Sequence, residues 1–263
     1  MLKDAKCIVF KVGTSTIMYP TRKTNIRVID SLAQVLCDLA NSGRRVVLVT
    51  SGAIGVGVEK LGLENRPRDT AGKQAAATVG QCALMYLYDK MFAQYGRSVG
   101  QLLMTKDDVD HANRKQNLIN AFQKLFDYGV IPIVNENDAV AVEEIVYGDN
   151  DSLSAVVATL VEADALVILT ETDGLYDANP ATNPDAKRIP VVEKITNEIR
   201  TMAGGTATGL GTGGMFTKVH AAEIAAESGI PTYIIHGTEP KLVYDLMDGA
   251  DVGTHFLAGK DEK

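Results

Sequence analysis

Short apolar runs alternate with longer helical patterns along this chain of 263 residues, and this alternation constrains the fold more than any other feature. The runs are rich in β-branched residues and apolar at nearly every position, as strands are when helices cover both faces of their sheet. The alternation predicts an α/β fold, a three-layer α/β/α sandwich with a mainly parallel central sheet. We expect its strands at residues 7–13, 45–51, 98–104, 130–136, 165–171 and 232–237.

The segments between these runs carry helical patterns. We expect helices at about residues 25–42, 70–95, 107–128, 152–162 and 217–228. Three of them stop next to a glycine, which is typical of helix ends. Residues 139–150 differ, because their alternating short β-type runs predict an antiparallel hairpin. Residues 173–190 predict a polar, proline-marked loop that is long enough to carry a function.

Composition and charge exclude several classes of protein. The net charge of −7, from 26 basic and 33 acidic residues, argues against a non-specific nucleic-acid binder, which needs a basic face. No apolar stretch is long enough to span a membrane, and the N-terminal residues do not resemble a signal peptide. Three cysteines without C-x-x-C spacing favour a reducing, cytoplasmic compartment, and four scattered histidines argue against structural zinc.

A glycine-rich segment, TGLGTGGMFTK (208–218), satisfies the pattern G-x-G-x-x-G. A dinucleotide-binding turn is disfavoured, because such a turn follows a strand and the preceding RTMAGGTAT is not one. The Walker pattern fails as well, since it needs Gly-Lys-Ser/Thr and the segment ends in Thr217-Lys218. Two interpretations stay open: a cradle for an anion at a helix N-terminus, or a mobile loop that caps a helix.

Two expected strands end in residues suited to an anion. In KVGTS (11–15), Lys11 closes an otherwise apolar strand and must find a counter-charge or solvent. In RVVLVTSGAIGVG (45–57), a strand runs directly into Ser51 and Gly52, although those glycines could serve the turn geometry alone. Ligands of open α/β sheets bind at the carboxyl ends of strands, so both ends are candidate phosphate sites.

Acidic and amide residues follow at two further places. IPIVNENDAV contains Asn135 and Asp138 at a strand end, and VYGDNDSLSA places Asp149, Asn150 and Asp151 before a helix. These groups could hold Mg²⁺, orient the lysines or receive a substrate ammonium, or Asn150 or Asp151 could simply cap the helix. Lysines and acids at one sheet edge, without a histidine or serine base, indicate phosphoryl transfer rather than hydrolysis.

Taken together, these segments resemble the glutamate 5-kinases, a branch of the amino-acid kinase family. KVGTS, VVLVTSGAIGVG, IPIVNENDAV, GDNDSLSA and TGGMFTK occur in the order found in that branch, between residues 11 and 218. The resemblance implies an enzyme that uses ATP and Mg²⁺ to phosphorylate the side-chain carboxylate of L-glutamate, the first step of proline biosynthesis. The alternative is a related amino-acid kinase with another carboxylate acceptor, such as N-acetylglutamate. A non-catalytic sensor would be free to lose Lys11, Asp151 or Lys218, and all three are present.

The resemblance also implies roles for individual residues. The catalytic ones would be Lys11 and Lys218, which contact the transferring phosphoryl group, and Asp151, which holds both lysines. The substrate-binding residues would be Ser51, Gly52, Asn135, Asp138, Asp149 and Asn150. The nucleotide pocket would be lined by Lys11, Thr170, Glu171, Asp173, Thr212, Gly213, Gly214, Met215, Phe216, Thr217 and Lys218. The usual Thr-Asp of the family is replaced here by Thr170-Glu171, with Asp173 close behind, and no residue is assigned as a metal ligand.

The resemblance bears on domains and partners too. We expect a single kinase domain over residues 1–263, in which residues 1–160 bind the substrate and residues 161–263 bind the nucleotide. Many bacterial members carry a C-terminal PUA domain, which we do not expect here. The family implies feedback inhibition by proline, which we would seek around Thr105–Asn117, and a homo-oligomer (dimer or tetramer). Hand-over of the product to glutamyl phosphate reductase is a further expectation, with no nucleic-acid or membrane partner.

Overall fold

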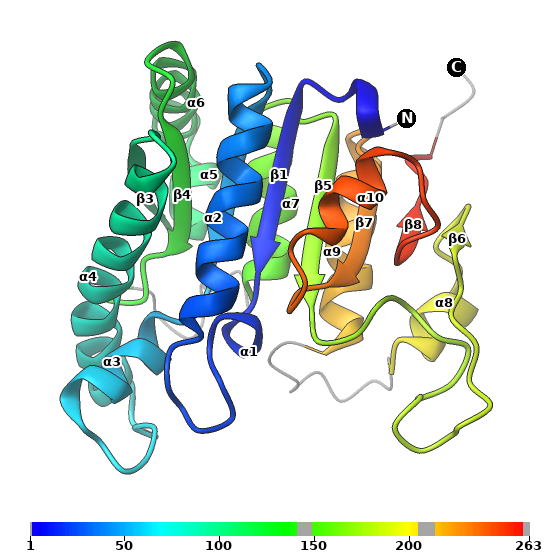
Figure 1. The fold of residues 1–263 in the computed structure, drawn as a ribbon, viewed down its shortest axis with the longest axis horizontal. Coiled ribbons are helices and arrows are strands. Elements are labelled where there is room, and N and C mark those ends of the chain that lie inside the picture. Colours follow the sequence, from blue (N-terminus) through cyan, green and yellow to red (C-terminus); the bar gives the residue numbers. More distant parts are fainter. Residues whose placement is uncertain (1, 141–148, 205–213, 260–263) are drawn as a thin grey trace.

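An eight-stranded sheet in the order β3-β4-β2-β1-β5-β7-β8-β6 forms the middle layer of the structure (Figure 1). The computed structural model describes residues 2–140, 149–204 and 214–259, and every element named below belongs to these ranges. Helices cover both faces of the sheet, so the expected three-layer α/β/α sandwich is confirmed.

The six expected strands are all present, and they run parallel to one another. They are β1 (Cys7–Val12), β2 (Arg45–Thr50), β3 (Val99–Met104), β4 (Ile131–Glu136), β5 (Ala165–Thr170) and β7 (Thr232–His236). Two strands that we did not expect extend the sheet beyond β7: β8 (Thr254–Phe256), antiparallel to β7, and β6 (Val191–Val192). Strands of two or three residues carry too little periodicity to be recognised in a sequence.

The longer helices agree with expectation, apart from one division and apart from α3, which was not expected. They are α2 (Ile26–Asn41), α3 (Ala53–Leu61), α4 (Thr70–Gln94), α6 (Ala112–Asp127), α7 (Asn150–Leu160) and α9 (Met215–Glu227). The short helices are α1 (Thr14–Ile17), α5 (Lys106–Asp110), α8 (Asn197–Met202), α10 (Leu242–Met247) and a 3-10 turn at Leu2–Asp4. Of these short helices, α1, α8, α10 and the 3-10 turn were not expected.

The single helix expected at 107–128 is wrong, because two helices occupy this stretch. Helix α5 starts with a capping box, in which the side chains of Thr105 and Asp108 each bond the other's backbone N–H. His111 then adopts extended backbone angles (φ −97°, ψ 115°), so α5 ends there and α6 starts anew. A capping box satisfies the free N–H groups at a helix start, which makes a separate short helix stable enough to form.

Strand β1 separates two hydrophobic cores. Ile8 and Phe10 belong to the core under α2, α4 and α10, whereas Cys7 and Val9 belong to the core under α6, α7 and α9. Because successive strand residues point to opposite faces, Lys11 shares the face of Cys7 and Val9. The strand therefore directs its one charged side chain toward α7 and α9.

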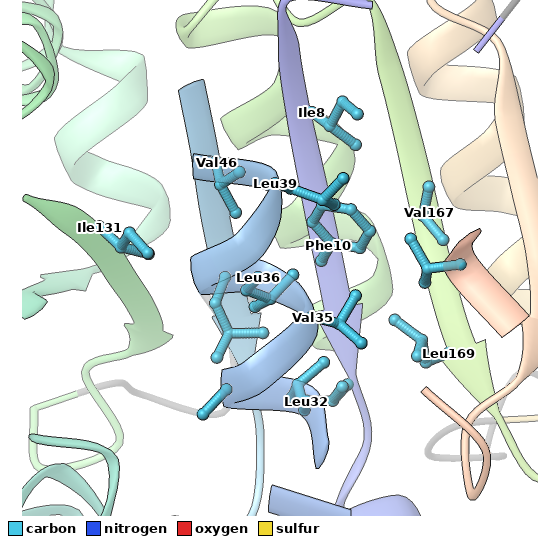
Figure 2. Close-up of a cluster of buried hydrophobic side chains, with 14 of the residues drawn as sticks. Ile8, Phe10, Leu32, Val35, Leu36, Leu39, Val46, Ile131, Val167 and Leu169 are labelled. Carbon is cyan, nitrogen blue, oxygen red and sulfur yellow. The ribbon is translucent and has the colours of Figure 1, made fainter. Parts of the chain in front are cut away.

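Figure 2 shows the first of these cores, where α2 packs over one face of the sheet. Leu32, Leu36 and Leu39 of α2 are buried against strand residues that include Phe10 and Leu169. Each such fully buried leucine contributes roughly 1.5–3 kcal/mol through the apolar surface it removes from water. The core thus fixes β1, β2 and β5 relative to one another.

The sheet grows in two directions from the pair β1–β5. Residues 1–160 supply β1 to β4 on one side, and residues 161–263 supply β5 to β8 on the other. The two halves meet where β1 pairs with β5, with Lys11 opposite Ile168. In a parallel sheet such a switch of direction leaves a crevice at the carboxyl ends of the strands, and ligands bind there.

Helices α3 and α4 approach each other closely because of two glycines. A Cβ at Gly80 would lie 1.7 Å from the carbonyl oxygen of Ala53, and one at Gly57 would lie 1.8 Å from that of Ala76. No side chain fits into such a gap. Gly52, just before α3, has φ +100°, a left-handed angle that glycine adopts without strain. These glycines let the chain turn sharply after β2 and pack α3 directly on α4.

The remaining expectations concern loops and membranes. Most of the hairpin expected at 139–150 lies outside the described residues. The segment expected as a loop at 173–190 is irregular over most of its length, with a β-bridge between Tyr176 and Arg188. Within the described ranges, we find no helix with the length and apolar character needed to cross a lipid bilayer.

Candidate active site

Strand ends and helix starts surround a cavity of ≈ 510 Å³ at the carboxyl edge of the sheet, beside the β1–β5 pair. The structure brings eleven of the residues expected from the sequence to its wall: Lys11, Ser51, Gly52, Asn135, Asp138, Asp149, Asn150, Asp151, Thr170, Glu171 and Lys218. They come from β1, β2, β4, β5, α7 and α9 and the turns beside them, so only the folded sheet assembles them. This cavity is the candidate active site.

At the centre of the cavity, two lysines form ion pairs with one carboxylate. Lys11 Nζ lies 2.5 Å from Asp151 Oδ1, and Lys218 Nζ lies 3.1 Å from Asp151 Oδ2. The hydroxyl oxygen of Thr217 is 2.7 Å from the same Oδ2. Asp151 is 1% exposed and each lysine 5% exposed, so the three charges form a buried cluster. One anion between two cations leaves a net positive charge, which suits a phosphate group.

Burial and charge compete in this cluster. Burial lowers the pKa of Lys11, and the neighbouring Lys218 lowers it further, while Asp151 opposes both. For Asp151, burial alone would raise the pKa, but Lys11 and Lys218 together hold it below its usual value. Asp151 therefore stays ionised at neutral pH. Its place in the first turn of α7 favours the same state, since helix N-termini stabilise negative charge.

Helix α7 presents its first residues to the cavity because Asp149 caps it. The Asp149 side chain accepts a hydrogen bond from the backbone N–H of Ser152 at 2.7 Å. The capping residue is thus Asp149, rather than Asn150 or Asp151. With the cap in front, Asn150 and Asp151 occupy the first turn, where their side chains reach β1 and β2.

The amide of Asn150 joins α7 to the ends of two strands. Its Nδ2 lies 2.9 Å from each of three acceptors: the carbonyl oxygen of Thr50, the hydroxyl of Ser51 and Oδ1 of Asn135. Its Oδ1 is buried and has no hydrogen-bond partner within the described structure. A buried acceptor without a donor is costly, so this atom is suited to receive a donor from a ligand.

Two further carboxylates and one arginine complete the electrostatics. Burial raises the pKa of Asp138, and Arg66 opposes that rise. Burial also raises the pKa of Asp149, against the hydrogen bond from Ser152. Raised pKa values mean that these carboxylates are ionised at a cost, which a cationic group on a ligand would offset. The acidic wall therefore suits an ammonium.

Some expected nucleotide-site residues lie away from the cavity wall. Asp173 accepts a hydrogen bond from the hydroxyl of Tyr176 at 2.7 Å, and Phe216 is 44% exposed. Gly214, Met215 and Thr217 form the start of α9 beside the wall, with Gly214 at the N-cap. Thr212 and Gly213 lie outside the described residues.

The segment around Thr105–Asn117, where we would seek proline inhibition, comprises α5 and the start of α6, and it does not contribute to the cavity wall described above.

Sequence reasoning missed other parts of the wall. Thr14 and Ser15 follow Lys11 in the motif KVGTS, and Gly55 belongs to the glycine-rich segment after β2, so those motifs could have identified all three. Gly13, Ala53, Ile54 and Glu136, which also line the wall, come from the same segments. Arg66 lies in the connection between α3 and α4, where no motif surrounds it.

The geometry invites comparison with known proteins. The profile described as "Amino acid kinase family" matches residues 6–236 of this chain. This chain belongs to the amino acid kinase family. It is 49% identical over 265 residues to the glutamate 5-kinase of Clostridium perfringens, covering 99% of this chain and 98% of that enzyme. It is 51% identical over 259 residues to the glutamate 5-kinase of Clostridium tetani, covering 98% and 97%.

Solved structures of other kinases share the fold at low identity. A carbamate kinase from Giardia lamblia bound to AMP-PNP has a TM-score of 0.67 and 15% identity, covering 97% of this chain and 99% of its own. The UMP kinase from Bacillus anthracis gives 0.66 and 14%, with 97% of each chain covered. The fold is therefore that of the amino acid kinase family.

Proposed function

We propose that this member of the family transfers the γ-phosphoryl group of ATP to the side-chain carboxylate of L-glutamate. The observation that carries the proposal is the ion cluster in which Lys11 and Lys218 each pair with one oxygen of Asp151. It lies at the junction of the two halves of the sheet, in a wall that also holds acids suited to an ammonium. The near-50% identity to glutamate 5-kinases over almost the whole chain agrees with this activity.

The chemistry needs charge neutralisation more than a base. A glutamate side chain has a pKa near 4.3, so the nucleophile is already ionised at neutral pH. One of its oxygens forms a bond to the γ-phosphorus while the bond from that phosphorus to the bridging oxygen breaks, and ADP leaves with the electron pair. Lys11 and Lys218 offset the repulsion between the two anions and stabilise the charge that develops on the transferred group.

The acidic part of the wall would recognise the α-amino group. Asp138 and Asp149 supply negative charge, and the unpartnered Oδ1 of Asn150 supplies a hydrogen-bond acceptor. Acetylation removes the charge of the amine and adds bulk, so N-acetylglutamate loses these interactions. We therefore favour free L-glutamate over the alternative acceptor.

The nucleotide would lie on the side of the cavity formed by Thr170, Glu171 and the start of α9. Helix N-termini attract phosphate through their unpaired N–H groups and partial positive charge. Within the described ranges no cluster of three or more His, Cys, Asp or Glu residues could cage a metal ion. Mg²⁺ fits as an ion carried by the nucleotide phosphates, since it keeps several waters and needs few protein ligands. It would supply further positive charge to the phosphoryl group.

The proposal extends to partners and compartment. We place the enzyme in the cytoplasm, in line with its free cysteines, two of them buried. Feedback inhibition by proline, a homo-oligomer and hand-over of the acyl phosphate to a reductase are included on the strength of the family resemblance.

The first experiment measures ADP release from ATP and Mg²⁺ with L-glutamate, N-acetyl-L-glutamate and L-aspartate, each with and without L-proline. Turnover with glutamate alone, suppressed by proline, is the expected result. Turnover with another acceptor would overturn the substrate assignment but leave the phosphate-handling lysines in place. If ADP appears with none of the three, the kinase assignment itself is wrong.

A further inference from the structure

Gln81 lies on α4 and lines a cavity of ≈ 370 Å³ that shares Ala53, Glu136 and Asp138 with the candidate active site. Its Oε1 accepts a hydrogen bond of 2.8 Å from Nδ2 of Asn135 at the end of β4. Gln81 does not form part of the wall described above. Its hydrogen bond with the wall residue Asn135 is the contact through which we expect it to act on a substrate.

This hydrogen bond decides which way the amide of Asn135 points. The backbone N–H of Glu136 donates to Asn135 Oδ1 at 2.9 Å, while Gln81 Oε1 takes the opposite end of the amide. An amide turned by 180° would set two donors against each other at Glu136, and Gln81 would no longer accept. Gln81 and the backbone together keep Asn135 Oδ1 directed toward α7.

Asn135 in turn helps to orient Asn150. Its Oδ1 is one of the three acceptors around Asn150 Nδ2, beside the carbonyl oxygen of Thr50 and the hydroxyl of Ser51. With the amino group held among these acceptors, Asn150 must turn its Oδ1 the other way. That oxygen is the buried acceptor without a partner at the cavity.

The hydrogen bond between Gln81 and Asn135 is accompanied by a free-energy cost at the other end of the Gln81 amide. Its own Nε2 is buried and has no partner among the described residues. Each buried unsatisfied donor calls for an explanation, and a function is one. The neighbouring Gly80 is packed against the carbonyl of Ala53, where a Cβ would lie 1.7 Å away. The backbone that carries Gln81 is therefore fixed against α3.

We propose that Gln81 is a positioning residue, which orients the amides of Asn135 and Asn150 so that Asn150 Oδ1 accepts a hydrogen bond from the α-ammonium of the substrate. The inference rests on the proposed function and deepens it. It assigns recognition of the amine to a relay that runs from α4 through β4 to α7. The phosphoryl-transfer residues Lys11 and Lys218 are not part of this relay.

The test compares three substitutions. Gln81→Met keeps the length of the side chain and removes the acceptor, whereas Gln81→Glu keeps an acceptor for Asn135. Gln94→Met makes the same change at an exposed glutamine near the end of the same helix and serves as the control. For each protein one measures kcat, the KM values for L-glutamate and ATP, and the inhibition constant of glutarate, which lacks the amine.

In Gln81→Met we expect the KM for L-glutamate to rise about tenfold, the worth of one hydrogen bond to a charged group. We expect kcat, the KM for ATP and the glutarate constant to stay within about twofold. Gln81→Glu should restore most of the glutamate affinity, and Gln94→Met should resemble the unaltered protein. A general loss of packing would weaken glutarate and ATP as well, so this pattern separates positioning from structure.

Two results would overturn the inference. One is an unchanged KM for L-glutamate in Gln81→Met; the other is a parallel loss for glutamate and glutarate that Gln81→Glu does not restore. The unaltered protein tests the proposed function separately, because its failure to phosphorylate glutamate would refute that function before any variant is compared.

Discussion

Among single residues, Lys11 and Lys218 carry the largest share of the proposed chemistry. Both are buried, and both lie against the same carboxylate. Neither lysine depends on the other to stay in place, because Asp151 offers one oxygen to each. Loss of either lysine therefore removes one cation from the cavity and leaves the other paired.

We predict that Lys11→Ala and Lys218→Ala keep the fold and lose most of the turnover. Removing one stabilising donor from a transition state costs about 2.7–4 kcal/mol, which corresponds to roughly 10²–10³ in kcat. Steady-state kinetics would measure the loss, and circular dichroism would verify the fold. Lys124→Ala, at an exposed lysine on α6, is the control. Near-normal activity in either buried variant would refute the assignment.

The pKa shifts predict a pH dependence. Burial raises the pKa of Asp138, so this carboxylate takes up a proton at a higher pH than an ordinary aspartate as the solution is acidified. The affinity for the α-ammonium of glutamate should fall as Asp138 becomes protonated. Because Arg66 lowers that pKa, Arg66→Ala should shift the acid limb of kcat/KM for glutamate to higher pH. Arg68→Ala is the matched control. No shift, or a shift to lower pH, would contradict the role given to Asp138.

On the alkaline side the prediction concerns kcat. Burial lowers the pKa of Lys11, so its positive charge is lost at a lower pH than the 10.5 of an ordinary lysine. As the pH is raised, kcat should therefore begin to decline before pH 10.5. A profile of kcat measured at saturating substrates would show the decline, and a flat profile up to 10.5 would contradict it.

Between elements, the closest contact is that of α3 with α4. Gly80 brings α4 against the carbonyl of Ala53, the first residue of α3, directly after the cavity residues Ser51 and Gly52. The contact between α3 and α4 therefore lies directly beside the wall of the candidate active site.

We predict that Gly80→Ala destabilises the protein and weakens glutamate binding together. The added Cβ has no space, and overpacking of this kind costs typically about 1–3 kcal/mol. Since α3 must shift to admit it, the KM for glutamate should rise with the loss of stability, measured by urea unfolding. Thr78→Ala, at an exposed position on the same helix, should change neither. Unaltered stability in Gly80→Ala would show that the contact is less tight than described.

The helices and strands also show which parts of the fold and of the candidate site can be predicted from the sequence. Lys11, Asn135 and Thr170 close long apolar strands, and parallel strands end at one edge, so their meeting was predictable. We did not expect helix α3, because Gly55 and Gly57 lower helix propensity and the packing that compensates for them is not visible in the sequence. Arg66 and Gln81 come from a connection and from the middle of a helix, and only tertiary packing brings them to the site.

For the molecule as a whole, Asp151 links the two halves of the sheet. It belongs to α7, while its partners come from β1 in the first half and α9 in the second. Helices α7 and α9 also share the apolar core on that face. The ion cluster to which we assign a catalytic role thus also joins the two halves of the sheet.

We predict that Asp151→Asn is strongly destabilising at neutral pH. Breaking a buried ion pair by removal of one partner costs about 3–5 kcal/mol, because the remaining charges lose their compensation. The pKa of Asp151 is lowered in the folded state, so its contribution is present above the pKa of an unfolded aspartate and is lost as the pH falls through the folded value. The difference from the unaltered protein in urea unfolding should therefore shrink in acid. A difference that grows in acid would contradict this sign.

A double variant tests the coupling within the cluster. Lys11→Met should cost less in the Asp151→Asn background than alone, because residues of one ion cluster are not additive. Strict additivity in denaturant unfolding would show that Lys11 and Asp151 act independently.

The position of Lys218, 67 residues after Asp151 in the sequence, has a consequence for biosynthesis. A ribosome delivers β1 and α7 long before α9, so a nascent chain that has folded its first half holds Asp151 against Lys11 alone. The proposed catalytic centre becomes complete only when α9 has been made and has docked. We therefore expect a chain interrupted before α9 to lack kinase activity.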